Sequence, residues 1–172
     1  RLRLFVDRYL DGAYHVLGGL DGGTQRIYVL VRKDGRLRNA RLCAEAHEYL
    51  SKKWLFDLAG DLRFQEYGFV RRPLVVQGDV DTAQGPKPFY VVAMHCKSKF
   101  VARGERMWGS RKPSERLRFV KHAIKNRRKI AAELTRTRKM LDSIIFAKES
   151  QPFVVTLGDF NDGPGQDFND GP

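Results

Sequence analysis

Cysteine and long apolar runs are scarce in this chain of 172 residues. The two cysteines, Cys43 and Cys96, stand in no metal-ligand spacing such as C-x-x-C and are too few for a disulfide framework. They indicate a reducing compartment, cytoplasmic by default. No run is apolar enough to span a membrane, and no signal peptide is visible, although we expect the N-terminus to be truncated. The length suits one domain with a substantial core.

Acidic residues are also few relative to basic ones: 20 Asp and Glu against 32 Lys and Arg, a net charge of +12. This balance favours polyanionic partners such as DNA, RNA or anionic lipid, and indicates no particular protein partner. The basic excess lies between Lys99 and Lys148, where aromatic residues are sparse, so a base-stacking platform is not indicated. The stretch is either the solvated face of a long helix or an electrostatic guide for a phosphate-bearing substrate.

The stretch near the C-terminus is the most informative. Residues 152–157 form an apolar, β-branched run that breaks at Gly158 and continues into Asp159 and Asn161. The pattern predicts a buried strand that delivers a carboxylate and a carboxamide to the edge of a sheet. Gly158 is expected to let the backbone turn sharply before Asp159. Acid–base and metal chemistry is commonly placed at such edges.

Two earlier runs carry or lead into polar groups that suit an anionic substrate. Residues 88–94 are strand-like and lead into His95, which a basic, hydroxyl-bearing turn follows. Residues 69–76 contain Arg71 and Arg72 just before a proline. Because side chains alternate along a strand, only one arginine faces a site there, and its spacing from the proline favours Arg71. Bidentate phosphate binding is a natural role for arginine.

In chain order, F-V-R-R-P, V-A-M-H-C-K-S-K and V-V-T-L-G-D-F-N-D resemble the motifs of the endonuclease/exonuclease/phosphatase superfamily, the DNase-I-like phosphoesterases. The resemblance extends over residues 14–163, with Cys96 where the family usually has Leu. It implies an α/β (α+β) fold over residues 1–163. That fold is part of a four-layer α/β sandwich, with two mainly antiparallel sheets flanked by helices.

The resemblance also implies hydrolysis of a phosphodiester or phosphomonoester by in-line attack of water, with Mg²⁺ or Mn²⁺ as cofactor, most like a nuclease. Asp159 would orient or deprotonate the water, and Asn161 would contact the scissile phosphate and steady the transition state. His95 would bind a phosphate oxygen or help protonate the leaving group. The residues expected around the substrate phosphate are Arg71, Lys97 and Ser98.

Two family elements are not found in this sequence: a Glu that ends an early strand and binds the metal, and a late S-D-H motif. The metal ligands are therefore unknown, with Asp159 as one possibility. Asp21, in a Gly-rich turn, is a weak candidate site residue. We expect a fragment, and two alternatives remain open. One is a catalytically incomplete fragment or basic module that binds nucleic acid or anionic lipid, and the other is an inositol or lipid phosphatase.

The motif D-F-N-D-G-P occurs at residues 159–164 and again at 167–172. Only the first copy follows a strand-like run, so it is taken as the functional one. Residues 164–172 are expected to form a disordered, duplicated tail. The second-copy residues assigned to this tail are Asp167, Asn169 and Asp170.

Hydrophobic periodicity predicts the remaining elements. Strands are expected at 13–17, 26–32, 54–56, 62–64, 72–78, 88–94 and 153–157, and helices at 2–10 and 113–148. Residues 36–43 are expected to pair back onto 26–32 as a hairpin. Ser114 is expected to cap the second helix, and residues 126–129 leave open whether it is one helix or two. The histidines without a partner pattern, treated as structural or exposed, are His15, His47 and His122.

Overall fold

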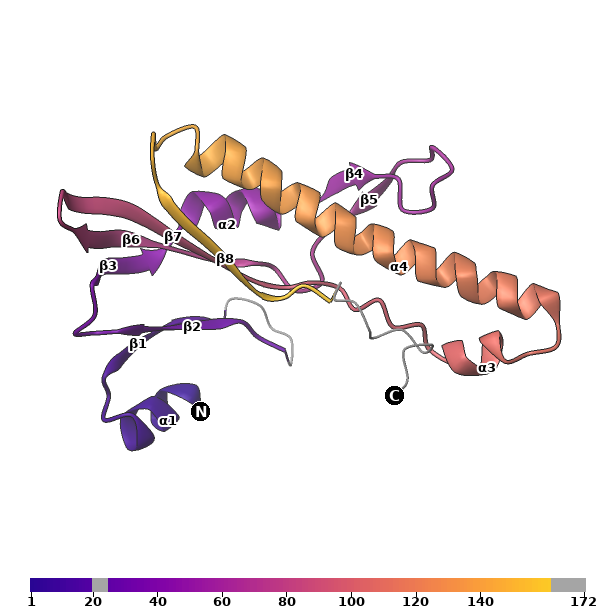
Figure 1. Ribbon diagram of the computed structural model, residues 1–172, viewed down its shortest axis with the longest axis horizontal. Coiled ribbons are helices and arrows are strands. Elements are labelled where there is room, and N and C mark those ends of the chain that lie inside the picture. Colours follow the sequence, from indigo (N-terminus) through magenta and orange to yellow (C-terminus); the bar gives the residue numbers. More distant parts are fainter. Residues whose placement is uncertain (20–24, 162–172) are drawn as a thin grey trace.

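The computed structural model describes residues 1–19 and 25–161, which form an α+β domain built in layers (Figure 1). Helix α1 (Leu2–Tyr9) lies outside a two-stranded sheet of β1 (Tyr14–Gly18) and β2 (Tyr28–Arg32). That sheet packs on one face of a four-stranded sheet, and helices α2 (Ala44–Ser51) and α4 (Pro113–Met140) cover the other face. The predicted α+β class and its partial four-layer sandwich are confirmed.

The four-stranded sheet has the order β3 (Leu37–Leu42), β6 (Leu74–Thr82), β7 (Gly85–His95) and β8 (Phe153–Asp159). All its neighbours are antiparallel except β7 and β8, which are parallel. The expected strand ends at residues 78 and 88 are wrong, because β6 and β7 continue beyond them as one long hairpin. Gly85 has φ +100° and Thr82 Oγ1 donates to its carbonyl, so two residues suffice for the turn.

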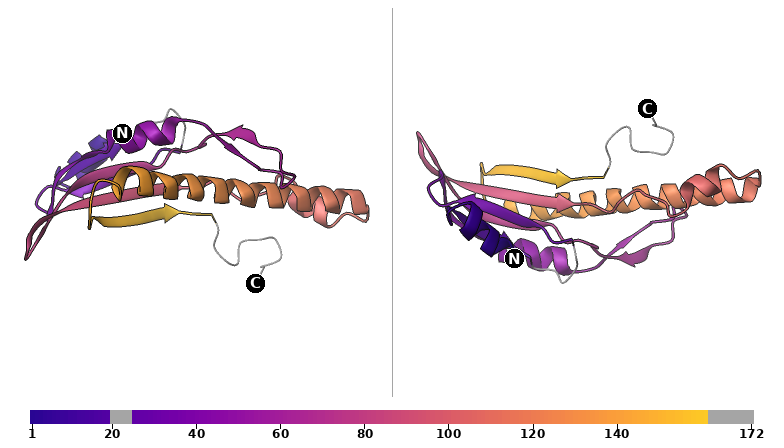
Figure 2. Two further views of the ribbon diagram at one scale, coloured as in Figure 1. Left: turned by 90° about the horizontal axis from the view of Figure 1, so that it is seen from above. Right: turned by 90° about the horizontal axis from the view of Figure 1, so that it is seen from below.

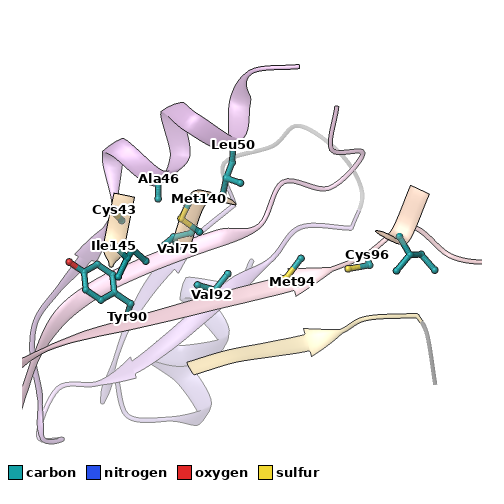
Figure 3. Packing of buried hydrophobic residues seen from close by; sticks show 11 residues of the cluster. Cys43, Ala46, Leu50, Val75, Tyr90, Val92, Met94, Cys96, Met140 and Ile145 are labelled. Carbon is teal, nitrogen blue, oxygen red and sulfur yellow. The ribbon is translucent and has the colours of Figure 1, made fainter. Parts of the chain in front are cut away.

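Strands β6 and β7 are apolar at nearly every position because both of their faces are buried. Leu74 and Val76 face the β1–β2 sheet, whereas Val75 and Val92 face α2 and α4. Figure 3 shows this helix-side core, in which residues of β7 line up beneath the two helices. The members labelled along β7 are Tyr90, Val92, Met94 and, just beyond the strand, Cys96.

One pairing expectation is wrong. Strand β3 pairs with β6 rather than with β2, and β1 and β2 pair only with each other. Strand β4 (Trp54–Phe56) was expected, but its partner β5 (Gln65–Tyr67) begins three residues later than predicted. The Asp57 carboxylate accepts hydrogen bonds from the backbone N–H groups of Gly60 and Leu62, which holds 60–62 in a turn. Helix α2 was not anticipated.

Helix α4 runs unbroken from Pro113 to Met140 and continues into a π-helical turn, η1 (Leu141–Ile145), so residues 126–129 do not interrupt it. Ser114 is not the N-cap; Lys112 is, because proline at the first helical position needs no hydrogen-bond acceptor for its nitrogen. The short helix α3 (Gly104–Trp108), also unanticipated, packs against the beginning of α4. Among the described helices, none has the length and apolar character needed to cross a membrane.

Strand β8 was expected to be buried, and this is wrong. Phe153, Val155 and Leu157 share one face and are 41–47% exposed, since the β1–β2 sheet does not extend beneath this edge strand. Only Val154 packs into the core beneath the helices. The strand is therefore covered on its helix side only around Val154, and the rest of it is exposed.

Candidate functional site

The site lies where the carboxyl-terminal ends of β7 and β8 meet. Because the two strands are parallel, His95 and Asp159 stand opposite each other in the register. The backbone N–H of Cys96 donates to the carbonyl of Asp159 at 2.8 Å and extends the pairing by one bond. The H-C-K-S and G-D-F-N motifs are thereby brought to one edge of the sheet.

Gly158 makes this approach possible. It has φ +131°, and a Cβ at this position would lie 1.9 Å from the carbonyl oxygen of Met94. Glycine is thus required by close packing of two strands, rather than by a sharp turn before Asp159 as expected. Gly158 lies within β8, directly before the candidate catalytic residue Asp159.

Arg71 joins the two motifs through backbone carbonyls. Its Nε donates to the carbonyl of His95 at 3.0 Å and its Nη2 to that of Cys96 at 2.6 Å. Asn161 Nδ2 donates to the same Cys96 carbonyl at 2.9 Å. Gln25, from the loop before β2, accepts from Arg71 Nη1. Of the two adjacent arginines, the structure therefore places Arg71 at this edge.

His95 and Asp159 face each other, with Nε2 3.7 Å from Oδ2. The separation is an ion-pair distance, longer than a hydrogen bond. Burial lowers the pKa of His95 below its ordinary value of 6.5, the nearby Arg71 guanidinium lowers it further, and Asp159 opposes them. The imidazole is therefore biased toward its neutral form.

Asn161 holds the carboxylate in place. Its backbone is left-handed at φ +53°, and its N–H donates to Asp159 Oδ1 at 2.9 Å. An Asn tolerates this conformation better than most residues. The Asp159 side chain is still 62% exposed, so its other oxygen is open to water or to a cation.

Lys97 and Ser98 line the start of the next loop. The backbone N–H of Lys97 donates to Glu133 Oε2 at 2.8 Å. The Ser98 hydroxyl accepts from the N–H of Phe100 at 3.1 Å, so it stabilises a local turn. No contact in the described residues joins either side chain to the Arg71–Asn161 group, and their predicted phosphate contacts remain predictions.

Sequence reasoning missed the support beneath this loop. Glu133 of α4 is 1% exposed, and its Oε1 accepts from the hydroxyl of Tyr67 at 2.9 Å. Burial raises the pKa of Glu133, while the hydrogen bonds from Lys97 and Tyr67 oppose the shift. Burial and the Glu133 charge likewise raise the pKa of Tyr67. The available signal was a lone carboxylate in the apolar stretch 130–134.

The expected metal site has only one described carboxylate, Asp159, together with the carboxamide of Asn161. Within residues 1–19 and 25–161, no three His, Cys, Asp or Glu side chains gather closely enough to hold an ion. These donors do not by themselves form a metal site, so no chemical step below passes through one. Asp21 and the second D-F-N-D copy lie outside the described residues.

The other histidines lie away from this edge. His47 is buried, and its Nε2 accepts from the backbone N–H of Val75, which is a structural role. His15 lines a cavity between α1 and the β1–β2 sheet. His122 lies on the exposed part of α4.

In comparisons with known proteins, no family model, no curated protein and no solved structure matches the chain. The resemblance to the endonuclease/exonuclease/phosphatase superfamily therefore rests on the three motifs and on the positions at which their residues meet.

Proposed function

We propose that this edge of the sheet binds and hydrolyses phosphate esters, with phosphodiesters as the main substrates. The observation that carries the proposal is the convergence of Arg71, His95, Asp159 and Asn161, from three separate segments, around the backbone of residues 95–96. The group combines a fixed cation, a neutral imidazole, a carboxylate and a carboxamide. This is a suitable set for binding a phosphate and activating water beside it.

Arg71 is suited to hold the substrate. Three of its five N–H groups are used by His95, Cys96 and Gln25, which fixes the orientation of the guanidinium plane. Two N–H groups, one on each terminal nitrogen, remain for a bidentate phosphate contact. Asn161 keeps its second amide N–H, which would donate to a phosphate oxygen without adding charge.

Asp159 is suited to orient the attacking water and to accept its proton, because one oxygen is fixed by Asn161 and the other is exposed. Neutral His95 would donate a hydrogen bond to a phosphate oxygen or take up a proton as charge develops. A divalent cation, when bound, would offset the negative charge of the phosphate. Mg²⁺ is the cation proposed; of the described residues, Asp159 offers it one carboxylate oxygen, and the roles assigned to Asp159 and His95 do not depend on the ion.

The test is hydrolysis of bis(p-nitrophenyl) phosphate with Mg²⁺, with Mn²⁺ and with EDTA. Asp159→Asn keeps the acceptor for the Asn161 N–H but cannot act as a base. The control is Asp81→Asn, which changes the same charge at a distant carboxylate paired with Arg38. We expect the rate to fall at least about 100-fold in the first variant, as for loss of a general base, and to stay unchanged in the control.

Absence of turnover with every cation would refute hydrolysis and favour the binding-module alternative. Turnover of inositol polyphosphates, with none of the diester, would favour the inositol phosphatase alternative. Equal rates for the two variants would show that any measured activity does not arise at this edge.

A further inference from the structure

The positive charge of the chain is concentrated in one segment, residues 97–129, which we term the basic arm. It contains 13 Lys and Arg and two acidic residues, Glu105 and Glu115, and therefore nearly all of the net charge of +12. The arm consists of the loop after β7, helix α3 and the first part of α4.

The arm extends from the candidate site. The chain leaves β7 at His95 and passes directly into the arm. In Figures 1 and 2, α3 and the beginning of α4 project past the ends of β7 and β8, on the side where the site lies. A long substrate bound at the site would thus run alongside the arm.

A cavity of about 360 Å³ lies between α3 and the beginning of α4. The charged groups in its lining are basic, with the exception of one carboxylate, that of Glu115. The basic residues around it are Arg103, Arg106, Lys112, Arg118 and, when protonated, His122, and the hydroxyl of Ser110 lies among them. The volume is large enough for a phosphate group, and the positive charge of the lining would attract its negative charge.

The cations of this cavity differ from those basic side chains that are held in ion pairs, such as Arg32 with Asp34, Arg38 with Asp81 and Arg138 with Asp142. Across the described part of the chain, the four Lys and Arg side chains of the cavity make no ion pair and no side-chain hydrogen bond. Like charges held together repel, and a bound anion would relieve the repulsion.

The exposed surface of the arm favours a nucleic-acid strand over a membrane. Leu117, Val120 and Ile124 are the exposed apolar residues of α4, and they span only about 60° of the helix at 3.6 residues per turn. A membrane-surface helix needs an apolar face of at least about 100°. Basic residues flank this stripe on both sides, and residues 113–129 extend about 25 Å, enough to follow several phosphates.

We propose that the basic arm docks the phosphodiester backbone of a nucleic-acid strand, with one phosphate in the cavity between α3 and α4. The inference rests on the proposed function and names nucleic acid as the substrate class of the site. Recognition through backbone phosphates carries no base preference, which agrees with the small number of aromatic residues in the arm.

The test is fluorescence anisotropy with labelled single-stranded DNA and RNA of about 20 nucleotides, between about 50 and 200 mM salt. The arm variant is Arg106→Ala, Lys112→Ala and Arg118→Ala. The matched control, Arg1→Ala, Arg36→Ala and Lys139→Ala, removes the same charge from exposed positions outside the arm. We expect the arm variant to bind at least about tenfold more weakly and to lower the salt slope by about 2, from about 0.7 per lost phosphate contact.

Equal weakening of the two variants, or unchanged binding by the arm variant, would overturn the proposal. Stronger binding to phosphatidylserine vesicles than to either oligonucleotide would reassign the arm to a membrane. If the unaltered chain binds one of the two oligonucleotides more tightly and the arm variant loses that preference, the arm docks that type of strand, DNA or RNA. Circular dichroism checks the fold, and Arg106→Gln with Arg118→Gln is the second variant if the first loses helix.

The experiments distinguish failure of the proposed hydrolysis from failure of the proposed docking on the basic arm. The arm variant should hydrolyse the small diester at the normal rate, because a small diester bound at the site does not reach the cavity between α3 and α4. Asp159→Asn should bind the oligonucleotide normally while losing hydrolysis. Oligonucleotide binding without hydrolysis in the unaltered chain would refute the proposed function and leave arm docking in place.

Discussion

Replacing Tyr67 with Phe tests the buried support beneath the site. The hydroxyl of Tyr67 donates to Glu133 Oε1, and the second carboxylate oxygen accepts from the N–H of Lys97. Phe keeps the aromatic ring, which packs edge-on against Trp54 at 5.2 Å, and removes only the oxygen. The change therefore isolates one hydrogen bond to a buried carboxylate.

A hydrogen bond to a charged group contributes about 1.5–3 kcal/mol, so we expect the free energy of unfolding to fall by about 2 kcal/mol. For a chain of this length that corresponds to a drop of roughly 4–8 °C in Tm. The Lys97 N–H remains bonded, so the His95–Lys97 segment should keep its position while becoming easier to open.

The effect should depend on pH in a defined direction. Burial raises the folded pKa of Glu133 above 4.5, so its contribution to stability is fully present below pH 4.5 and is lost as pH rises through the folded pKa. The Tyr67 hydrogen bond opposes that loss by favouring the ionised form. The cost of Tyr67→Phe should therefore be largest at high pH and fall to about 1 kcal/mol, the value for a neutral pair, once Glu133 is protonated.

Urea denaturation of both proteins at about pH 8 and about pH 4 measures the two costs. A difference below about 0.5 kcal/mol at the higher pH would show that the carboxylate does not depend on Tyr67. A cost that grows toward acid pH would show that the sign of the coupling is wrong.

The remaining predictions concern Gly158 and His95. Gly158→Ala should lower the free energy of unfolding by at least about 2 kcal/mol in a denaturation curve, because its Cβ would meet the Met94 carbonyl. Gly85→Ala is the control: its φ is also positive, but nothing lies within 4 Å, so it should cost about 1 kcal/mol, and equal costs would contradict the close-approach argument. The imidazole of His95 should titrate below 6.5 by NMR and move upward in Arg71→Met, whereas titration above 6.5 would contradict the site electrostatics. Because the folded pKa is depressed, the stability that neutral His95 contributes is present above pH 6.5 and is lost as pH falls through the folded pKa.

The central part of the fold could be predicted because its sequence pattern has one physical meaning. The apolar runs that became β6 and β7 are buried on both faces, and the polar groups that follow them lie at a shared edge. Parallel pairing of β7 and β8 could not be derived from either run alone. It depends on Gly158 and Met94, which are far apart in sequence.

The wrong predictions have a common cause. Whether an apolar residue is buried depends on which elements pack against it in the folded chain, and a local sequence pattern does not indicate this. The run 153–157 is as apolar as a buried strand, yet none of the other described elements packs on the face formed by Phe153, Val155 and Leu157. The sequence of the run does not indicate which elements will pack against it. Leu117 and Ile124 similarly continue the apolar stripe of α4 beyond the part that packs on the sheet. The Tyr67–Glu133 contact joins residues 66 positions apart, so no local pattern could indicate it.

The site residues are organised around the backbone of Cys96. Its carbonyl receives Arg71 and Asn161, its N–H pairs with Asp159, and its side chain points into the core and is 1% exposed. The main chain of Cys96 thus organises the site, while its side chain is buried in the core. An apolar residue that fits the core at position 96 should therefore preserve the polar geometry of the site. Mutational tolerance at the geometric centre of the site is therefore expected to exceed that of the residues surrounding it.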